Sequence, residues 1–560
     1  MDIAGKELST LTMDHHGLVA SVCHDLGIAE KINKRLDKGD LRRVVSAGKS
    51  VVAMIINGLG FTNRRLYLTH QFFENKPTEI LLNESIQSSD ITNYTLGHTL
   101  DEIAAFGASN LFAEVAFETA IEHDLINQVN HLDSTSISVH GTYQSDDDMD
   151  EDNPSMIKIT QGFSKDHRPD LNQIVLSMVV NGACSFPLFM EPLNGNSSDK
   201  TSFHKTIEKV RDFQKQINIQ SNFKWIADSA LYTKDGLLKS NDYNWLTRVP
   251  ETIKEAKTLV QQPDEQVKWQ ILNERYKIAQ FASNYGDIQQ RWLLVFSQDS
   301  FDREQKTVEK NIKKKESGLT NLLWHLGNEL FLCEDDAENS LKKIEDKQNL
   351  FILKHELIPV YKYEKRGKPK ANELPKLKGY KIKATYVRNE ENIKKILNTK
   401  GRFVLATNDL DVTSISDEDM LSEYKQQQKV EGGFRFLKDP WFMVDSIFLK
   451  SPKRIEALMM VMTLTLMVYN VAQHKLREAL KIQNETLPNQ LNKPIQNPTM
   501  RWIFQLFEGV TIVQFYEQNT PNPVRSVISN LNAVRLKIIR LFGNTACRLY
   551  GINYTKFVTS

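Results

Sequence analysis

The stretch HLDSTSISVHG, residues 131–141, alternates apolar and polar side chains between Leu132 and Val139. This period of two is typical of a β-strand with one buried face. Asp133 lies within the predicted strand, where a carboxylate is costly to bury unless a cation or hydrogen bonds stabilise it. We therefore treat Asp133 as the first candidate for a functional residue.

The segments around this strand predict a mixed α/β fold. A helix is expected from Ser202 to Gln216. Further strands are expected at Met156–Thr160, Ile174–Val180, Phe186–Met190, Phe223–Ala227 and Trp245–Val249. Strands in succession, then a helix, then strands again indicate a mixed sheet flanked by helices.

A second candidate, Asp228, directly follows the predicted strand Phe223–Ala227 in the segment KWIADSALYT. If this strand is a neighbour of the strand that carries Asp133, the two carboxylates converge at one edge of the sheet. A third carboxylate from a helix would complete a set of hard oxygen ligands suited to Mg²⁺. Two such ions about 4 Å apart activate a water or a 3′-hydroxyl in phosphodiester chemistry. An ordinary structural role for both aspartates stays open.

The segment LSEYKQQQKVEGGFRFLKDP offers the third carboxylate. Tyr424, Glu431 and Lys438 follow one another at intervals of seven residues, which places them near one face of a continuous helix. Gln427 lies one turn from both Tyr424 and Glu431. Such a face can bind metal through its carboxylate and hold phosphates through its other side chains, although an ordinary charged helix face is the alternative. The Gly432–Gly433 pair indicates close approach of another backbone, such as DNA, or a break in the helix.

A basic tract lies between residues 352 and 402, with 15 Lys or Arg against 5 Asp or Glu. Tyr361, Tyr363, Tyr380 and Tyr386 stand among its lysines. Basic residues interleaved with aromatics suit a nucleic-acid surface. A solvated, charged β-face explains the same composition, and both interpretations remain open.

Composition excludes several classes of protein. The chain has 560 residues, and its 71 Lys or Arg balance 70 Asp or Glu, so it is not uniformly basic. Its four cysteines lie far apart, which excludes a CxxC metal site and a disulfide scaffold. The N-terminus has no signal-peptide pattern. The apolar run Ala457–Gln473 is short for a membrane span and predicts a buried core helix, so we expect a cytoplasmic protein without a membrane partner.

In these motifs the chain resembles a known family, the DDE transposases of the insertion-sequence-four group, and is most similar to its sixteen-thirty-four branch. The group's signature is Tyr, two residues, Arg, three residues, Glu, six residues, Lys. Tyr424, Glu431 and Lys438 match it in register, and Gln427 replaces the Arg. The wider matches are HLDSTSISVHG, GFSKDHRPDLNQ, WIADSAL and YKQQQKVEGGFRFLKDP.

This resemblance implies a ribonuclease-H-like catalytic core in which Asp133, Asp228 and Glu431 are the three acids and bind two Mg²⁺ ions, with Mn²⁺ as a substitute and no organic cofactor. The further residues that the resemblance assigns to DNA binding are Tyr424, Gln427, Arg435 and Lys438. The implied activity is cleavage at the ends of a mobile element and transfer of the freed 3′-hydroxyls to target DNA. The implied partners are transposon-end DNA, target DNA and a second copy of the chain, in the nucleoid-associated cytoplasm of a prokaryotic cell.

The same resemblance divides the chain into five regions. We expect a helical N-terminal region at residues 1–125, where helices on both sides of Gly27 fit either a helix-turn-helix for DNA binding or an ordinary bundle. The core is expected to begin at 126–254, to be interrupted by a β-rich basic insertion at 255–415, and to be completed by a catalytic helix at 416–450. A helical C-terminal region is expected at 451–560.

Two other functions are compatible with these residues. One is a ribonuclease-H-like nuclease that cuts DNA without joining it, because the same site performs both reactions. The other is a DNA-binding remnant without catalysis, which Gln427 and the Gly432–Gly433 pair would suit.

Overall fold

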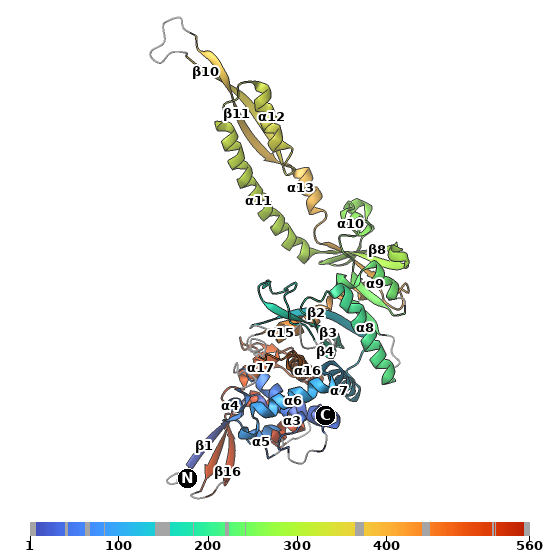
Figure 1. Ribbon diagram of the computed structural model, residues 1–560, viewed down its shortest axis with the longest axis vertical. Helices are drawn as coiled ribbons and strands as arrows, with labels where there is room; N and C mark the ends of the chain where they lie inside the picture. Colours follow the sequence, from blue (N-terminus) through green and yellow to red (C-terminus); the bar gives the residue numbers. More distant parts are fainter. Residues whose placement is uncertain are drawn as a thin grey trace, which may run out of the picture. The chain divides into compact units, whose positions relative to one another are not determined.

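The computed structural model describes residues 7–37, 39, 43–61, 68–82, 85–140, 157–182, 184–218, 223–240, 242–363, 374–439, 449–517, 520 and 522–553. They form two compact units, one within residues 1–247 and 422–560 and the other within residues 248–421 (Figure 1). Parts of three predicted features lie outside the described residues: Met156, residues 364–373 of the basic tract and residues 440–448 of the expected catalytic helix.

The sheet of the first unit confirms the mixed α/β class. Its strands are β2 (Val129–Val139), β3 (Asn172–Asn181), β4 (Phe186–Leu193), β5 (Lys224–Ala227) and β6 (Trp245–Arg248). They lie in the order β4-β3-β2-β5-β6. β2, β3 and β4 are antiparallel to one another in turn, whereas β5 is parallel to both β2 and β6. β2 is therefore the strand at which the sheet changes from antiparallel to parallel pairing.

The strand expected at Met156–Thr160 does not form among the described residues of that segment. Its one ladder contact is a single bridge between Thr160 and Gln173. The backbone of Lys158 instead accepts a hydrogen bond from the amide of Gly195 at 2.9 Å and donates one to the side chain of Asn194 at 2.8 Å. The loop after β4 thus takes the hydrogen bonds that a neighbouring strand would have made.

Helices cover this sheet and build the rest of the first unit. Those before the sheet are α1 (His16–Asp25), α2 (Ile28–Leu36), α3 (Ala47–Gly58), α4 (Thr69–Phe73), α5 (Thr78–Leu82), α6 (Asn93–Phe106) and α7 (Ala108–Glu122). Those within or after it are α8 (Asp199–Gln216), α9 (Lys234–Lys239), α15 (Gln428–Leu437), α16 (Pro452–Ile482), α17 (Met500–Leu506), α18 (Ala533–Phe542) and α19 (Asn544–Leu549). The boundary between the units falls within α14 (Asp417–Lys425), after Leu421. Gly27 at φ +62° separates α1 from α2, and Gly107 at φ +98° separates α6 from α7, because glycine adopts positive φ without steric cost.

The central helix of the unit is α16. It packs on β4 on one side and on α1, α3, α6, α7 and α18 (Figure 1). Ala457–Val468 is buried throughout. By length and composition α16 is long and apolar enough to cross a membrane, but 83% of its apolar window is buried inside the unit. The expectation of a core helix is confirmed, because the apolar surface that a membrane would contact is already covered by protein.

Both ends of the chain also contribute strands, which the purely helical flanks expected from the sequence did not include. β1 (Glu7–Thr12) pairs antiparallel with β15 (Thr511–Tyr516), and β15 pairs with β16 (Arg525–Ser529). A two-stranded ribbon of β13 (Leu487–Pro488) and β14 (Pro494–Ile495) lies between α16 and α17 in the sequence. β-branched and aromatic residues favour β15 locally, but its partner β1 is about 500 residues away in sequence.

The second unit contains a small sheet and a helix-covered ribbon. The sheet strands are β7 (Gln270–Asn273), β8 (Tyr276–Ser283), β9 (Gln290–Ser297) and β12 (Arg402–Thr407), in the order β12-β9-β8-β7. The ribbon is β10 (Phe351–Lys362) with β11 (Lys376–Arg388), and the helices are α10 (Lys254–Gln261), α11 (Gln298–Asn328), α12 (Glu334–Glu345) and α13 (Glu390–Leu397). The ribbon, α11 and α12 share their own hydrophobic core, which includes Ile312, Leu319, Leu341, Leu353 and Ile382.

Candidate active site

Asp133 lies on β2, and Asp228 directly follows the neighbouring parallel strand β5. The register of β2 with β5 pairs Leu132 with Ala227, and the two aspartates directly follow this pair. β5 ends there, while β2 continues to Val139. The condition set by the sequence, that the two strands are neighbours, is met, and both carboxylates stand where the shorter strand stops. Their role as metal ligands stays a prediction.

Burial raises the pKa of both carboxylates. The side chain of Asp133 is 14% exposed, and desolvation, opposed by Lys165 and by the Ser134 amide at 2.7 Å, raises its pKa to about 7. Desolvation also raises the pKa of Asp228, although the Ala230 amide donates to it at 2.8 Å. Because burial penalises the charged form, a bound cation would stabilise the ionised pair.

Two further charged residues belong to this site and were missed in the sequence. The Lys165 ammonium lies 3.8 Å from Asp133 and 3.2 Å from Asp199, and it donates to the Ser134 carbonyl at 2.6 Å. Asp199 accepts a hydrogen bond from the Ser134 hydroxyl, and its charge raises the pKa of both Asp133 and Asp228. Lys165 stands in the quoted GFSKDHRPDLNQ stretch, whereas Asp199 has the usual chemistry of a helix N-terminus and gave no separate signal.

α15 lies on the face of the sheet to which Asp133 points. Asp133 and Met178 are opposite each other in the β2–β3 register, so their side chains share a face. A Cβ added at Gly433 would lie 3.4 Å from the Met178 side chain and 3.1 Å from Leu466 of α16. Gly433 is therefore a close-packing position between α15, β3 and α16. Gly432, by contrast, meets nothing within 4 Å.

Gln427 fastens the start of α15 to β2. Its side-chain amide donates to the Leu132 carbonyl at 2.8 Å, which leaves its oxygen to accept from His131 Nδ1 at 3.1 Å. Both side chains are buried, and desolvation lowers the pKa of His131 to about 4, so the imidazole is neutral. The sequence predicted a DNA contact for Gln427. The structure places its amide against the strand that carries Asp133.

The continuous helical face expected from Tyr424 to Lys438 is corrected by the structure. α14 ends at Lys425 and α15 begins at Gln428, with tightened three-residue hydrogen bonds from Gln427 to Tyr424 and from Val430 to Gln427. Tyr424 therefore belongs to a different helix from Glu431. The tightening occurs where the Gln427 side chain turns toward β2, a contact across 296 residues that helical periodicity does not register.

The remaining predicted residues divide into two environments. Glu431 and Arg435 are exposed, one turn apart on α15, and Gly432 lies between them on the same exposed side. Lys438 directly follows α15, and its ammonium is 2.7 Å from Asp166, in the same turn as Lys165. That turn thus contacts both the strand carboxylate and the end of the helix.

The carboxylate oxygens at this site are of the kind that bind a hard divalent cation, but they do not surround a cation position. Within the described ranges, no group of three or more His, Cys, Asp or Glu is placed to hold a metal ion. The observation that favours a cation is chemical: two largely buried carboxylates with raised pKa values, together with Asp199, stand beside the ammonium of Lys165. Asp133 and Asp228 would hold the ion, with Glu431 as the candidate that supplies a further oxygen from α15.

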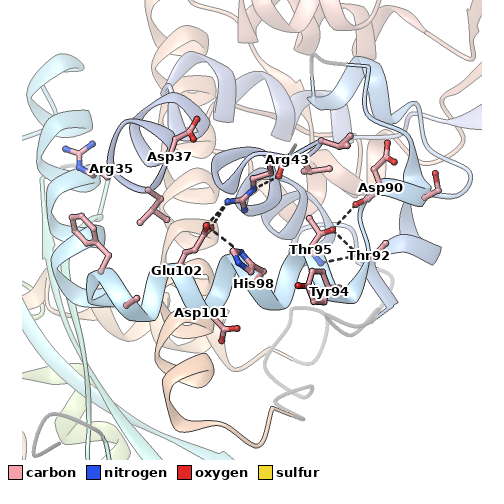
Figure 2. A pocket seen from close by; sticks show the side chains of 16 residues that line it. Arg35, Asp37, Arg43, Asp90, Thr92, Tyr94, Thr95, His98, Asp101 and Glu102 are labelled. Carbon is pink, nitrogen blue, oxygen red and sulfur yellow. Dashed lines mark hydrogen bonds and ion pairs between the residues drawn. The ribbon is translucent and has the colours of Figure 1, made fainter. Parts of the chain in front are cut away.

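A separate hollow of about 1060 Å³ lies among α2, α6 and the segments between them. Figure 2 shows Arg43 turned toward Glu102, which also faces His98. Arg43 bonds both carboxylate oxygens of Glu102 at 2.7–2.8 Å, and His98 lies 3.5 Å from Glu102. Because its charges are internally compensated, the hollow has no surplus of positive charge for a phosphate, and we do not assign the chemistry to it.

Residues 8–117 match the model of a family described as a domain of unknown function, DUF4277. No curated protein matches the chain. The chain is similar to the solved cryo-EM structure of the piggyBac transposase synaptic complex with hairpin DNA, with a TM-score of 0.36 and 9% sequence identity over 87% of this chain and 79% of that one.

Proposed function

We propose that this chain is a DDE-type DNA transposase with a ribonuclease-H-like core. It would cleave DNA at the ends of a mobile element and transfer the 3′-hydroxyls to target DNA. The observation that supports it most is the placement of Asp133 and Asp228 side by side at the end of β5, with α15, the helix that carries the exposed Glu431, packed on the same face of the sheet. The core would combine residues 126–254 and 416–450, and residues 255–415 would be its insertion.

Each proposed residue has a distinct task. Asp133, Asp228 and Glu431 would hold two Mg²⁺ ions, or Mn²⁺ in their place. When bound, these ions supply activation of a water or 3′-hydroxyl and stabilisation of the leaving oxygen. Asp199 would keep the Lys165 ammonium close to Asp133. The Lys165 nitrogen lies 3.8 Å from the Asp133 carboxylate.

The contacts to DNA would come from α14, from the exposed side of α15 and from the residue that follows α15. Arg435 is exposed beside Glu431, and Lys438 is bound to Asp166, so a phosphate would compete with that carboxylate for the ammonium. Tyr424 would contact the same DNA from α14. Gln427 is a positioning residue in this proposal, because it joins the start of α15 to β2. We further propose transposon-end DNA and target DNA as partners, a homodimer as the working form, and the prokaryotic cytoplasm as the location.

The test is a cleavage and strand-transfer assay with Mg²⁺ and a duplex that carries the terminal repeats flanking the gene. Glu431→Gln should lower nicking about a hundredfold to a thousandfold, the loss expected when one strong transition-state contact is removed. Glu418→Gln is the matched control, since Glu418 is an exposed acid on α14 that belongs to the other compact unit.

The outcomes separate the candidate functions. Nicking without joining of pre-cut ends would favour the nuclease. Specific binding without nicking by the wild type would favour the remnant. Full nicking by Glu431→Gln would remove Glu431 from the site.

A further inference from the structure

The β10–β11 ribbon has two chemically different faces. Residues paired in an antiparallel register point to the same side, and pairs alternate between the two sides. One face carries Phe351, Leu353 and Leu357 opposite Arg388, Tyr386 and Ile382, and α11 and α12 pack on it (Figure 1). We call this the inner face.

The other side of the ribbon, here the outer face, is exposed. Its register pairs are Ile352 with Val387, Lys354 with Thr385, Glu356 with Lys383 and Ile358 with Lys381, of which only Lys381 is half-buried. The next pair, Val360 with Gly379, is not part of this exposed face, because Gly379 is buried against the backbone of Phe331. The exposed fractions of Ile352, Ile358 and Val387 are 47%, 42% and 44%, which is high for apolar residues in the middle of a strand. The outer face therefore combines exposed apolar side chains with three lysines and one glutamate.

The basic side chains of the two faces differ in whether a carboxylate pairs with them. On the inner face, Arg388 bonds Glu309 at 3.0 Å and Glu316 at 3.3 Å, both on α11, so its charge is neutralised within the protein. On the outer face, no carboxylate among the described residues lies within 4 Å of the ammonium of Lys354, Lys381 or Lys383. These three lysines are thus available to an anionic partner.

We propose that the outer face binds double-stranded DNA as a two-stranded ribbon, with Lys354, Lys381 and Lys383 on phosphates. The major groove is about 12 Å wide and admits such a ribbon. None of the eight residues in the four exposed outer-face pairs is aromatic, so this face has no platform for stacking the bases of a single strand. The proposal rests on the proposed function for the presence of DNA, and adds a second DNA contact in a different compact unit from the three acids.

The test measures equilibrium binding of the full-length protein to a random-sequence 30-base-pair duplex, without divalent ions, across a range of salt concentrations. The ribbon variant is Lys354→Gln/Lys381→Gln/Lys383→Gln. The matched control is Lys342→Gln/Lys343→Gln/Lys347→Gln, three exposed lysines on and just after α12, on the covered side of the same ribbon. Circular dichroism and thermal unfolding of both variants check that the fold is retained.

Each phosphate contact contributes about 0.9 to the slope of log affinity against log salt. The ribbon variant should therefore lose about 2.7 of that slope, while the control keeps the wild-type value. Equal slopes for wild type and ribbon variant would overturn the proposal, as would an equal loss in the control. An equally large loss of slope with single-stranded DNA, or with anionic vesicles, would also overturn the proposal. The face would then bind any anionic partner by its charge, without a preference for double-stranded DNA.

Failure of this inference and failure of the proposed function give different results. If the ribbon does not bind DNA, its slope stays unchanged while Mg²⁺-dependent nicking still depends on Asp133. If the chain is not a transposase, nicking is absent from the wild type while the ribbon variant still lowers the slope.

Discussion

The carboxylate site on β2 and β5 and the outer face of the β10–β11 ribbon handle charge in opposite ways. At the site, Asp133 and Asp228 are largely buried and their pKa values are raised, so proximity and desolvation work against ionisation. On the ribbon, the exposed Lys354 and Lys383 and the half-buried Lys381 are spread over two strands, where water screens their charges. Burial should make the first region sensitive to pH and divalent ions, while exposure should make the second sensitive to salt.

The largest expected effect tests whether the two regions have separate tasks. Asp228→Asn should lower nicking about a hundredfold to a thousandfold and leave duplex binding without divalent ions unchanged, because it removes one ligand oxygen charge and little volume. The ribbon triple variant should show the reverse, with weaker binding and an unchanged nicking rate once the DNA is bound. Single-turnover nicking at saturating protein separates the two quantities. A reduced single-turnover rate in the ribbon variant would mean that the regions act together.

The second effect concerns stability and pH. The raised pKa means that folded Asp133 holds its proton up to about pH 7, while an unfolded aspartate loses it near 3.8. Between these values the folded state binds more protons than the unfolded state, so the free energy of unfolding falls as pH rises. Asp133→Asn removes this loss and should be more stable than the wild type at pH 8, by at most about 4 kcal/mol, and not at pH 4.

Urea denaturation at pH 4 and pH 8 without divalent ions measures that difference. Mg²⁺ at pH 8 should stabilise the wild type and not the variant, because only the ionised carboxylate binds the ion. An identical pH dependence in both proteins would show that Asp133 ionises normally.

A third effect tests whether Gln427 holds the start of α15 against β2. Gln427→Ala would leave the buried Leu132 carbonyl and His131 Nδ1 without this partner, and an unsatisfied buried polar group costs about 1–3 kcal/mol. Because the same bonds hold α15 to β2, nicking should fall as well. Gln428→Ala is the control, since the neighbouring Gln428 is exposed. Equal stability of the two variants would remove Gln427 from its positioning role.

Some of the features behind these tests could be predicted from the sequence, and others could not. Local alternation identified β2, and the position of Asp228 after a strand was visible, so two of the three proposed acids could be placed from the sequence alone. The apolar run of α16 also identified a core helix. The break between α14 and α15, the contact of Gln427 with His131, and the ammonium of Lys165 beside Asp133 could not be foreseen. Each depends on residues distant in sequence, and periodicity reports only on neighbours within a turn or a strand.

The smallest expected effect uses the adjacent glycines of α15 as a matched pair. An added Cβ at Gly433 meets Leu466 at 3.1 Å, so Gly433→Ala should cost about 1–3 kcal/mol through overpacking. An added Cβ at Gly432 meets nothing within 4 Å, so Gly432→Ala should gain up to about 1 kcal/mol from helix propensity. If DNA approaches the exposed side of α15, Gly432→Ala should nevertheless slow nicking while it stabilises the fold. Thermal unfolding and single-turnover nicking of the two variants measure both quantities, and unchanged nicking in Gly432→Ala would place the DNA backbone away from this glycine.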